Sequence, residues 1–268
     1  VGSIGEQAFD YCSDLISVIF QGPSSMASIG NYAFRECGSL ASITIPDSVA
    51  GIGLQAFDNC SGLISVIFQG PSSVASIGDY AFRDCSSLTS IAIPNSVTSI
   101  GINAFSSCIG LTSASFQEPS KISGIGKGVF SGCSGLESIT IPDSVTAIGE
   151  SAFSSCIGLT SVTFQEQSKV AGIGVNAFRG CSSLTSIAIP SSVTGIGESA
   201  FEGCTGLTGI TIPDSVTGIA DYAFYGCTAL QSIDVDPSNT VYSSDDGVLY
   251  SKDKTTLITY PAGKANGS

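Results

Sequence analysis

The hydrophobic and polar positions of the chain repeat with a period of about 24 residues. Neighbouring cysteines lie alternately 25 and 23 residues apart, until two final intervals of 23. Each unit reads I-G-x-x-A-F-x-x-C-x-x-L-x-S-I-x-I, and longer units continue with F-Q-G/E-P-S in place of P-x-S-V-T. Residues 1–235 therefore comprise ten repeats of 23 or 25 residues, and two successive units make a 48-residue double repeat.

Each repeat predicts one strand and one turn. In residues 88–93 the β-branched residues alternate, and Pro94 ends the run because it cannot donate a ladder hydrogen bond. The I-G-x-x-A-F-x-x-C segment predicts a short helical or 3₁₀ turn, in which Phe82 and Cys85 share one face.

One strand and one turn cannot bury their own apolar side chains, so the repeats are expected to stack into a solenoid with a continuous core. The predicted core ladder includes Phe34, Phe57, Phe82, Phe105, Phe130, Cys37, Cys60, Cys85, Cys108 and Cys133.

The pattern C-x-x-L-x-S-I-x-I-P-x-S-V-x-x-I-G-x-x-A-F, which runs from about Ile4 to Val235, resembles the BspA-like (Treponema-type) leucine-rich repeats. The resemblance implies an α/β repeat solenoid that is right-handed and curved, with a parallel sheet on its concave face and the short turns opposite. It also implies a secreted or surface-attached protein, since several members of the family are regarded as adhesins.

Residues 236–268 depart from the repeat. Strand-like runs alternate with turn clusters, which predicts an antiparallel meander that covers the last repeat, followed by a tail. The run GVLYSKDKTTLITYPAGK is similar to the C-terminal cap of the same family. No cap pattern precedes the first repeat, whose apolar face is expected to be unprotected.

The amino-acid composition excludes several classes of function. The net charge is −13, so nucleic acid and anionic lipid are poor partners. The chain has no histidine, which removes the commonest general base and the commonest zinc ligand, and no apolar run is long enough to insert directly into a membrane. We therefore expect neither an enzyme nor a cofactor.

The cysteines favour free, buried thiols over disulfides or a metal site. Equivalent cysteines in stacked repeats would have Cβ atoms about 4.8 Å apart, whereas a disulfide needs roughly 3.5–4.5 Å. No C-x-x-C cluster suggests a thiolate metal site. The acidic group formed by Asp234, Asp236, Asp245 and Asp246 fits turn chemistry better than a calcium loop.

The remaining candidate for function is the outward face of the sheet. Its central row carries small hydroxyls and aliphatic residues, with Gln or Pro two positions later, so it is almost uncharged. Ile19 and Ile67 stand out near the N-terminus, whereas the direction of Ile16 and Ile64 is ambiguous. The predicted partner-binding residues are Ile19, Gln21, Thr44, Ile67, Gln69, Ala92, Ser115 and Gln117. The alternative is a purely structural role, in which these residues are present because they suit exposed strand positions.

Three functions are compatible with these features of the sequence. The first is a monomeric, secreted or cell-surface binding module of adhesin type, which recognises an extracellular, host or neighbour-cell protein through the concave face. The second is a passive spacer, which the near-identical repeats favour. The third is an ice-binding solenoid, against which the mixed rows and the expected curvature both count.

Overall fold

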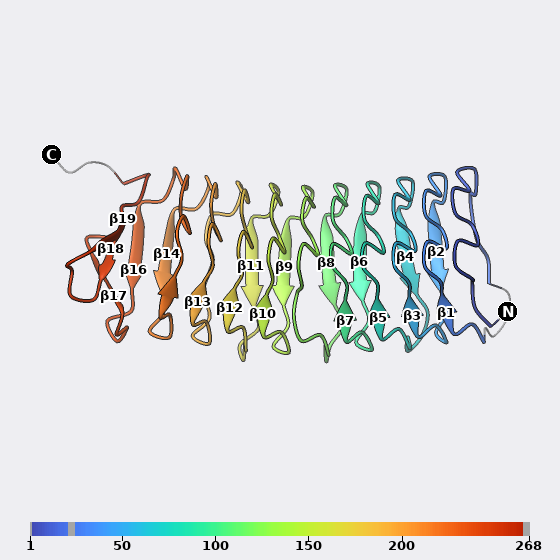
Figure 1. The fold of residues 1–268 in the computed structure, drawn as a ribbon, viewed down its shortest axis with the longest axis horizontal. Coiled ribbons are helices and arrows are strands. Elements are labelled where there is room, and N and C mark those ends of the chain that lie inside the picture. The colour runs from blue at the N-terminus through green and yellow to red at the C-terminus, as the bar shows by residue number, and fades with distance from the viewer. Residues whose placement is uncertain (1, 21–24, 265–268) are drawn as a thin grey trace.

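The computed structural model describes residues 2–20 and 25–264. These residues form a long stack of similar rungs, with the two termini at opposite ends (Figure 1). Most rungs contribute one segment to a parallel sheet, one to a second ladder of very short strands, and one to a row of turns. The solenoid and its parallel sheet are as predicted, but the described residues contain no helix, so the fold is a parallel β-solenoid and not an α/β one.

The main sheet is built from the L-x-S-I-x-I segments. Its strands pair in the order β11-β9-β8-β6-β4-β2, and β14 pairs separately with β16. The register is exact from repeat to repeat, since Thr44 lies beside Ile67 and Thr140 beside Thr163. The strands are β2 (Ser42–Ile45), β4 (Ser65–Phe68), β6 (Ser90–Ile93), β8 (Ser113–Phe116), β9 (Ser138–Ile141), β11 (Ser161–Phe164), β14 (Gly209–Ile212) and β16 (Ser232–Val235).

A second ladder runs along another side of the stack. Its two-residue strands carry the Ile of the I-G motif, pair in the orders β1-β3-β5-β7 and β10-β12-β13-β15, and bury most of these isoleucines. The motif's glycine is needed because the rungs approach closely: a Cβ on Gly78 would lie 2.6 Å from the carbonyl carbon of Gly53. The strands are β1 (Ser28–Ile29), β3 (Gly51–Ile52), β5 (Ser76–Ile77), β7 (Ser99–Ile100), β10 (Ala147–Ile148), β12 (Gly172–Ile173), β13 (Gly195–Ile196) and β15 (Gly218–Ile219).

The turn segments are not helical, so the expectation of helical or 3₁₀ turns is wrong for the described residues. In the segment from Gly78 to Cys85, Tyr80 and Asp84 have positive φ values of 56° and 57°, which a right-handed helix excludes. Backbone N–H groups alternate between an acceptor in the next rung and one in their own rung. Phe82 N–H donates to Ala104 O of the next rung at 2.7 Å, whereas Arg83 N–H donates to Tyr80 O of its own rung at 3.1 Å. Consecutive β-turns therefore replace the helix, because they free every second N–H to bond the next rung.

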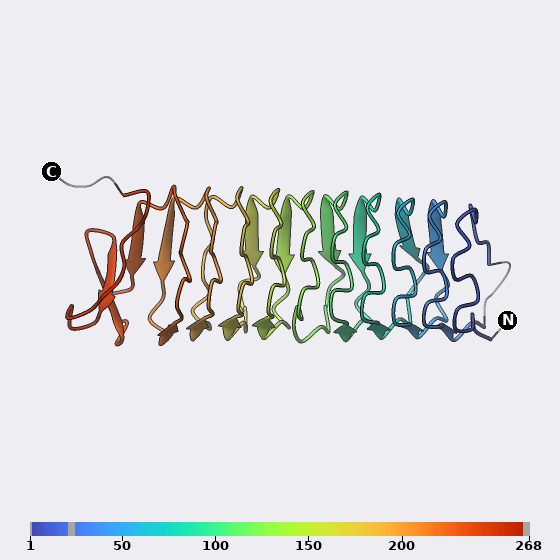
Figure 2. The same ribbon diagram turned by 45° about the horizontal axis from the view of Figure 1, so that its top comes forward.

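The same turns explain a second correction. The resemblance implied a curved solenoid with a concave sheet, yet the stack is nearly straight (Figures 1 and 2). A solenoid curves when one side is wider than the other, as when a helix about 10 Å across stands opposite strands about 4.8 Å apart. Here backbone hydrogen bonds join the rungs on the turn side as well as in the sheet. Both sides thus have the spacing of a β-ladder.

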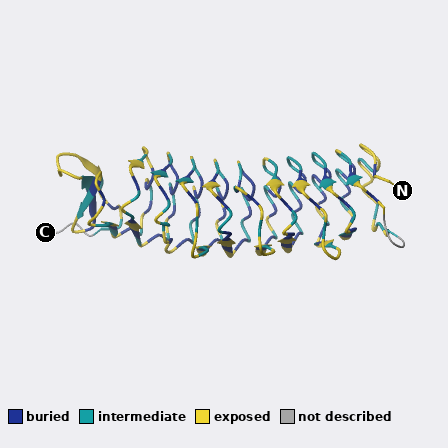
Figure 3. Cartoon of the chain, turned by 90° about the horizontal axis from the view of Figure 1, so that it is seen from below, coloured by how far each residue is buried: buried dark blue, intermediate teal, exposed yellow. Residues whose placement is uncertain are grey.

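The core is a column of stacked side chains inside the rungs, where the buried segments of Figure 3 lie. The A-F phenylalanines stack face to face from Phe9 to Phe224, with ring centroids 5.0 to 5.7 Å apart. The ten residues of the predicted core ladder are all fully buried. In the first rung, Phe9, Leu15 and Val18 are only partly buried, because among the described residues a rung stacks on one of their faces only.

An antiparallel sheet follows the last rung. It contains β17 (Tyr242–Asp245), β18 (Val248–Ser251) and β19 (Leu257–Thr259), in that order. Asp246 and Gly247, both with positive φ, form the two-residue turn between β17 and β18. Gly247 O accepts the N–H of Ile233, which joins this sheet to the last rung.

Candidate protein-binding surface

The sheet face consists of the outward-pointing residues of the main sheet. Hydrogen bonds fix the order of its first rungs: Ser17 is bridged to Ser42, Ala41 N–H donates to Ile16 O, and Ile64 N–H donates to Ala41 O. Residues 42–45 of the second rung pair with residues 65–68 of the third. The predicted partner-binding residues Ile19, Thr44 and Ile67 of the first three rungs are therefore neighbours in space.

Four isoleucines of the first and third rungs are strongly exposed. The exposed fraction is 80% for Ile19, 70% for Ile16, 53% for Ile67 and 51% for Ile64. The ambiguous positions Ile16 and Ile64 thus point outward as well. We call these four residues the isoleucine patch. It is notable because buried β-branched residues fill the inward positions of the same strands.

The other predicted residues divide into two groups. Thr44 lies between the isoleucines of the patch, and Gln69 is exposed at the end of β4. Ala92 lies beside Ser115 further along the sheet. Ser115 lines a shallow hollow of about 280 Å³ with Thr140 and Gln165, and the exposed Gln117 follows β8. Gln21 lies outside the described residues.

The cysteines form a hydrogen-bonded column rather than a chemical site. Nine are buried and Cys12 is exposed, and all ten are free thiols. Burial raises the pKa of Cys181 to about 12 and that of Cys227 to about 11, because an apolar environment disfavours the thiolate. Thiols held in the neutral form are poor nucleophiles.

The acidic residues near the C-terminus serve turns and ion pairs, as the sequence predicts. Asp236 Oδ1 accepts the N–H of Ser238 at 2.8 Å, and Asp245 and Asp246 pair with Lys254 and Lys264. Within residues 2–20 and 25–264, no three metal-binding side chains cluster together. The same ranges contain no helix of the length and hydropathy needed to cross a membrane.

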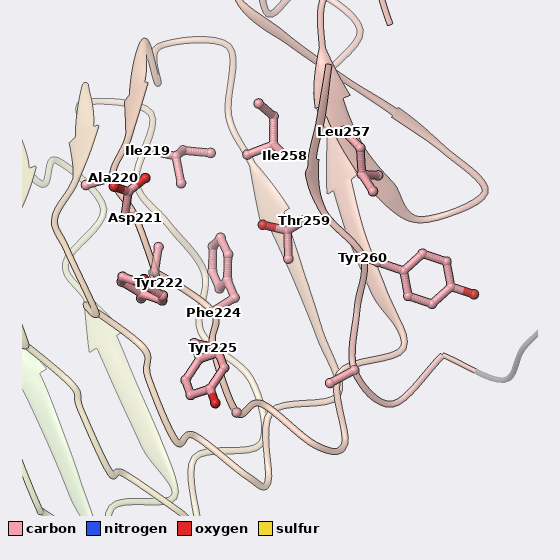
Figure 4. A pocket seen from close by; sticks show the side chains of 13 residues that line it. Ile219, Ala220, Asp221, Tyr222, Phe224, Tyr225, Leu257, Ile258, Thr259 and Tyr260 are labelled. Carbon is pink, nitrogen blue, oxygen red and sulfur yellow. The ribbon is translucent and has the colours of Figure 1, made fainter. Parts of the chain in front are cut away.

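Two features of the turn side were not predicted from the sequence. Arg83 binds the buried carboxylate of Asp58 through two hydrogen bonds of 2.8 Å and lies over the ring of Tyr80. At the C-terminal end, Tyr222 and Tyr225 border a groove beside β19 (Figure 4). A signal for the second was present, because the repeat position of Tyr225 is charged or Ser in the other nine units.

A stack of parallel strands with Leu, Phe and Cys ladders inside defines the class of leucine-rich-repeat solenoids. The chain matches the BspA type leucine rich repeat region, in six copies, over residues 1–71, 68–172 and 167–265. It belongs to this family. No curated protein is recognisably similar to the chain.

Solved structures agree with this assignment. A leucine-rich repeat protein from Bacteroides ovatus is 30% identical over 89% of this chain and 77% of that chain, with a TM-score of 0.50. A leucine rich cell surface protein from Faecalibacterium prausnitzii is 32% identical over the same shares, with a TM-score of 0.49. The pneumococcal vaccine antigen PcpA, 20% identical over 98% of this chain and 71% of that chain, has a TM-score of 0.55 and shares the fold.

Proposed function

We propose that the protein is a non-enzymatic binding module which recognises another protein through the isoleucine patch. The observation that carries the proposal is the exposure of four isoleucines, between 51% and 80%, within three adjacent rungs. These positions could carry Thr or Ser, as most of the equivalent positions of later rungs do. Clustered apolar residues on a soluble surface are typical of interaction sites.

The chemistry of the patch favours a protein partner. Covering one exposed isoleucine completely stabilises a complex by roughly 1.5–3 kcal/mol, so four can offset much of the cost of association. Thr44 within the patch and Gln69 at its margin supply hydrogen-bonding groups. The central row has no charged residue before Asp234, so binding is expected to depend weakly on salt.

Location outside the cell forms part of the same proposal. The F. prausnitzii relative is described as a cell surface protein and PcpA as a vaccine antigen. We therefore propose a secreted or surface-attached monomer whose partner is an extracellular, host or neighbour-cell protein. The charge of −13 argues against nucleic acid as that partner.

The experiment compares two double variants. Ile19→Asp with Ile67→Asp places charge in the patch, whereas Thr163→Asp with Thr211→Asp places the same charges on the distant part of the sheet face. Purified extracellular-matrix and surface proteins are screened by biolayer interferometry, and a hit is then measured with both variants. Loss of at least tenfold in affinity for the isoleucine pair alone supports the patch. Loss for the threonine pair alone contradicts it.

A passive spacer is the second candidate, and the straight stack of near-identical rungs favours it. A spacer acts through its length, so the isoleucine pair would leave its role intact. Deleting one 48-residue double repeat would instead shorten the reach of the full-length protein. A binding defect in the isoleucine pair at unchanged length distinguishes the binding module from the spacer.

The expected curvature counted against an ice-binding solenoid, and the straight stack removes that objection. The central row still mixes Ile67, Ala92, Ser115 and Asp234 with threonines, which breaks a regular hydroxyl lattice. Thermal hysteresis of the purified protein tests this candidate directly. The binding module predicts none.

A further inference from the structure

A groove separates the last turn segment from the antiparallel sheet at the C-terminal end (Figure 4). Its volume is about 900 Å³, within the roughly 300–1,000 Å³ typical of ligand clefts. One wall is the segment from Ile219 to Gly226, and the other is formed by β19 and the residues that follow it. The groove is distinct from the isoleucine patch, which lies at the opposite end of the stack.

The backbone of the inner wall is a row of unused donors. In the preceding rung, the N–H groups of Ser199, Phe201 and Gly203 each donate to the last rung, at 3.1, 2.8 and 2.8 Å. The equivalent N–H groups of the last rung belong to Tyr222, Phe224 and Gly226. Within the described part of the chain these three have no acceptor. Because donors of every rung point toward the next rung, these three face the groove.

Aromatic and aliphatic side chains line part of the groove, beside the polar Asp221 and Thr259, although a terminal rung would be expected to be polar throughout. Tyr225 occupies a position filled by Glu202 in the preceding rung and by charged residues or Ser in all others. Its ring lies edge-on to that of Tyr222, with centroids 5.9 Å apart. The exposed fraction is 66% for Tyr225 and 63% for Tyr222, and Ile258 of β19, whose side chain points toward the turn segment in Figure 4, is 39% exposed.

The outer wall has an open edge as well. β19 is the last strand of its sheet and pairs only with β18. A polypeptide lying in the groove would therefore meet unpaired backbone groups on one wall and an edge strand on the other. Edge strands of this kind bind further strands readily.

We propose that this groove binds a peptide segment of a partner polypeptide, which presents a carbonyl oxygen from every second residue. These carbonyls accept the N–H groups of Tyr222, Phe224 and Gly226, and the apolar side chains of the segment pack on Tyr222, Tyr225 and Ile258. The spacing of the donors selects a polypeptide, since each earlier rung satisfies the same donors with backbone carbonyls. A whole rung of a second copy cannot stack there, because the antiparallel sheet stands in its way (Figure 1).

The probe is a fluorescein-labelled peptide with the sequence of residues 29–40 and the change Cys37→Ser. In the protein, the carbonyls of Asn31, Ala33 and Arg35 in this segment accept the equivalent N–H groups of the first rung at 2.8 to 2.9 Å. Fluorescence anisotropy measures binding, and hydrogen exchange measures the three amides. We expect saturable binding and exchange slowed by at least tenfold at Tyr222, Phe224 and Gly226. A peptide of the same composition in scrambled order is the peptide control.

Two variants locate the site. Tyr225→Asp copies the polar side chain of other rungs and is expected to weaken binding by at least tenfold. Tyr11→Asp removes a similarly exposed aromatic ring, 64% exposed, from the opposite end and leaves binding unchanged. No saturable binding, or binding with unchanged exchange at the three amides, overturns the proposal. Dimers seen by light scattering that Tyr225→Asp dissociates would identify a second copy as the occupant and also overturn it.

Discussion

The thiol of Cys85 donates a hydrogen bond to the backbone carbonyl of Phe57 in the preceding rung, with sulfur 3.2 Å from oxygen. The same carbonyl accepts the N–H of Cys60 from its own rung at 3.2 Å. Every buried cysteine repeats this bond, from Cys37 to Cys227. Cysteine suits the position because it is small, apolar and still a weak donor.

Thiol accessibility follows from this column. In the native protein, only the exposed Cys12 should react quickly with a thiol reagent such as Ellman's reagent, whereas all ten thiols should react after unfolding in denaturant without reductant. The rate and the final amplitude of the absorbance change give the number of reactive thiols in the native and the unfolded protein. Recovery of fewer than six thiols in denaturant would show that disulfides have formed.

Alkaline pH should destabilise the fold. Burial raises the pKa of Cys181 to about 12 and that of Cys227 to about 11, whereas an unfolded thiol has a pKa near 8.5. Below about pH 8.5 both states are protonated and the stabilisation is complete; as pH rises further the unfolded state loses protons first, so stability falls. Each such thiol contributes a slope of up to about 1.4 kcal/mol per pH unit until its folded pKa is reached.

Urea unfolding at pH 7, 8.5 and 10.5 measures this loss. We expect a constant midpoint up to about pH 8.5 and a lower one at 10.5. The double variant Cys181→Ala with Cys204→Ala is the control, because it removes two of the thiols and should show a shallower decline. Equal declines in both proteins would assign the pH effect to other groups.

The phenylalanine column should make the middle rungs more sensitive than the ends. Phe130 is fully buried and stacks on Phe105 and Phe153, with both centroid distances 5.6 Å. Phe130→Ala should cost roughly 3–5 kcal/mol of unfolding free energy. Phe9 stacks only on Phe34 and is partly buried, so Phe9→Ala should cost less. Equal losses in chemical denaturation would argue against coupling between neighbouring rungs.

The ion pairs of the turn side differ in burial and should differ in strength. The Asp58 side chain is 3% exposed and holds Arg83 through two hydrogen bonds. Arg83→Met leaves this buried carboxylate with the Gln55 amide as its remaining hydrogen-bond donor and should cost about 1–3 kcal/mol. Lys127 and Glu150 are 53% and 49% exposed, so Lys127→Met should cost less than about 1 kcal/mol. Thermal unfolding of both variants measures the two stability losses. Equal losses would show that burial of the ion pair does not determine its contribution.

Asn239 should hold the antiparallel sheet in place. Its buried amide donates to Pro213 O and Val216 O at 2.8 and 2.9 Å and accepts the N–H groups of Val241 and Tyr242. Asn239→Ala should cost about 2–4 kcal/mol, because it leaves several of these groups unpaired. Hydrogen exchange should rise in β17–β19 but not in the middle rungs. Asn95→Ala, at an exposed position, is the control and should change neither.

The repeat, its length, the strands of the main sheet and the buried ladders could all be predicted from the amino-acid sequence, whereas the second ladder of two-residue strands could not. A period that places Phe, Cys, Leu and Ile at fixed intervals can bury those residues only by stacking, so architecture and core followed together. The hairpin at Asp246-Gly247 was also predictable, since those residues adopt positive φ readily. The free thiols followed from the spacing between stacked strands, which is too wide for a disulfide.

The conformation of the turns, the shape of the stack and the two candidate surfaces depend on contacts between rungs and became visible in the three-dimensional structure. The pair Phe82 and Cys85 fits a helix by spacing alone, but bonds to the next rung compete with bonds inside the rung, and Tyr80 adopts positive φ as a result. The same bonds equalise both sides and keep the stack straight. The exposure of Ile16 and the open amide of Tyr222 likewise depend on which neighbour is present, and a local pattern does not contain that information.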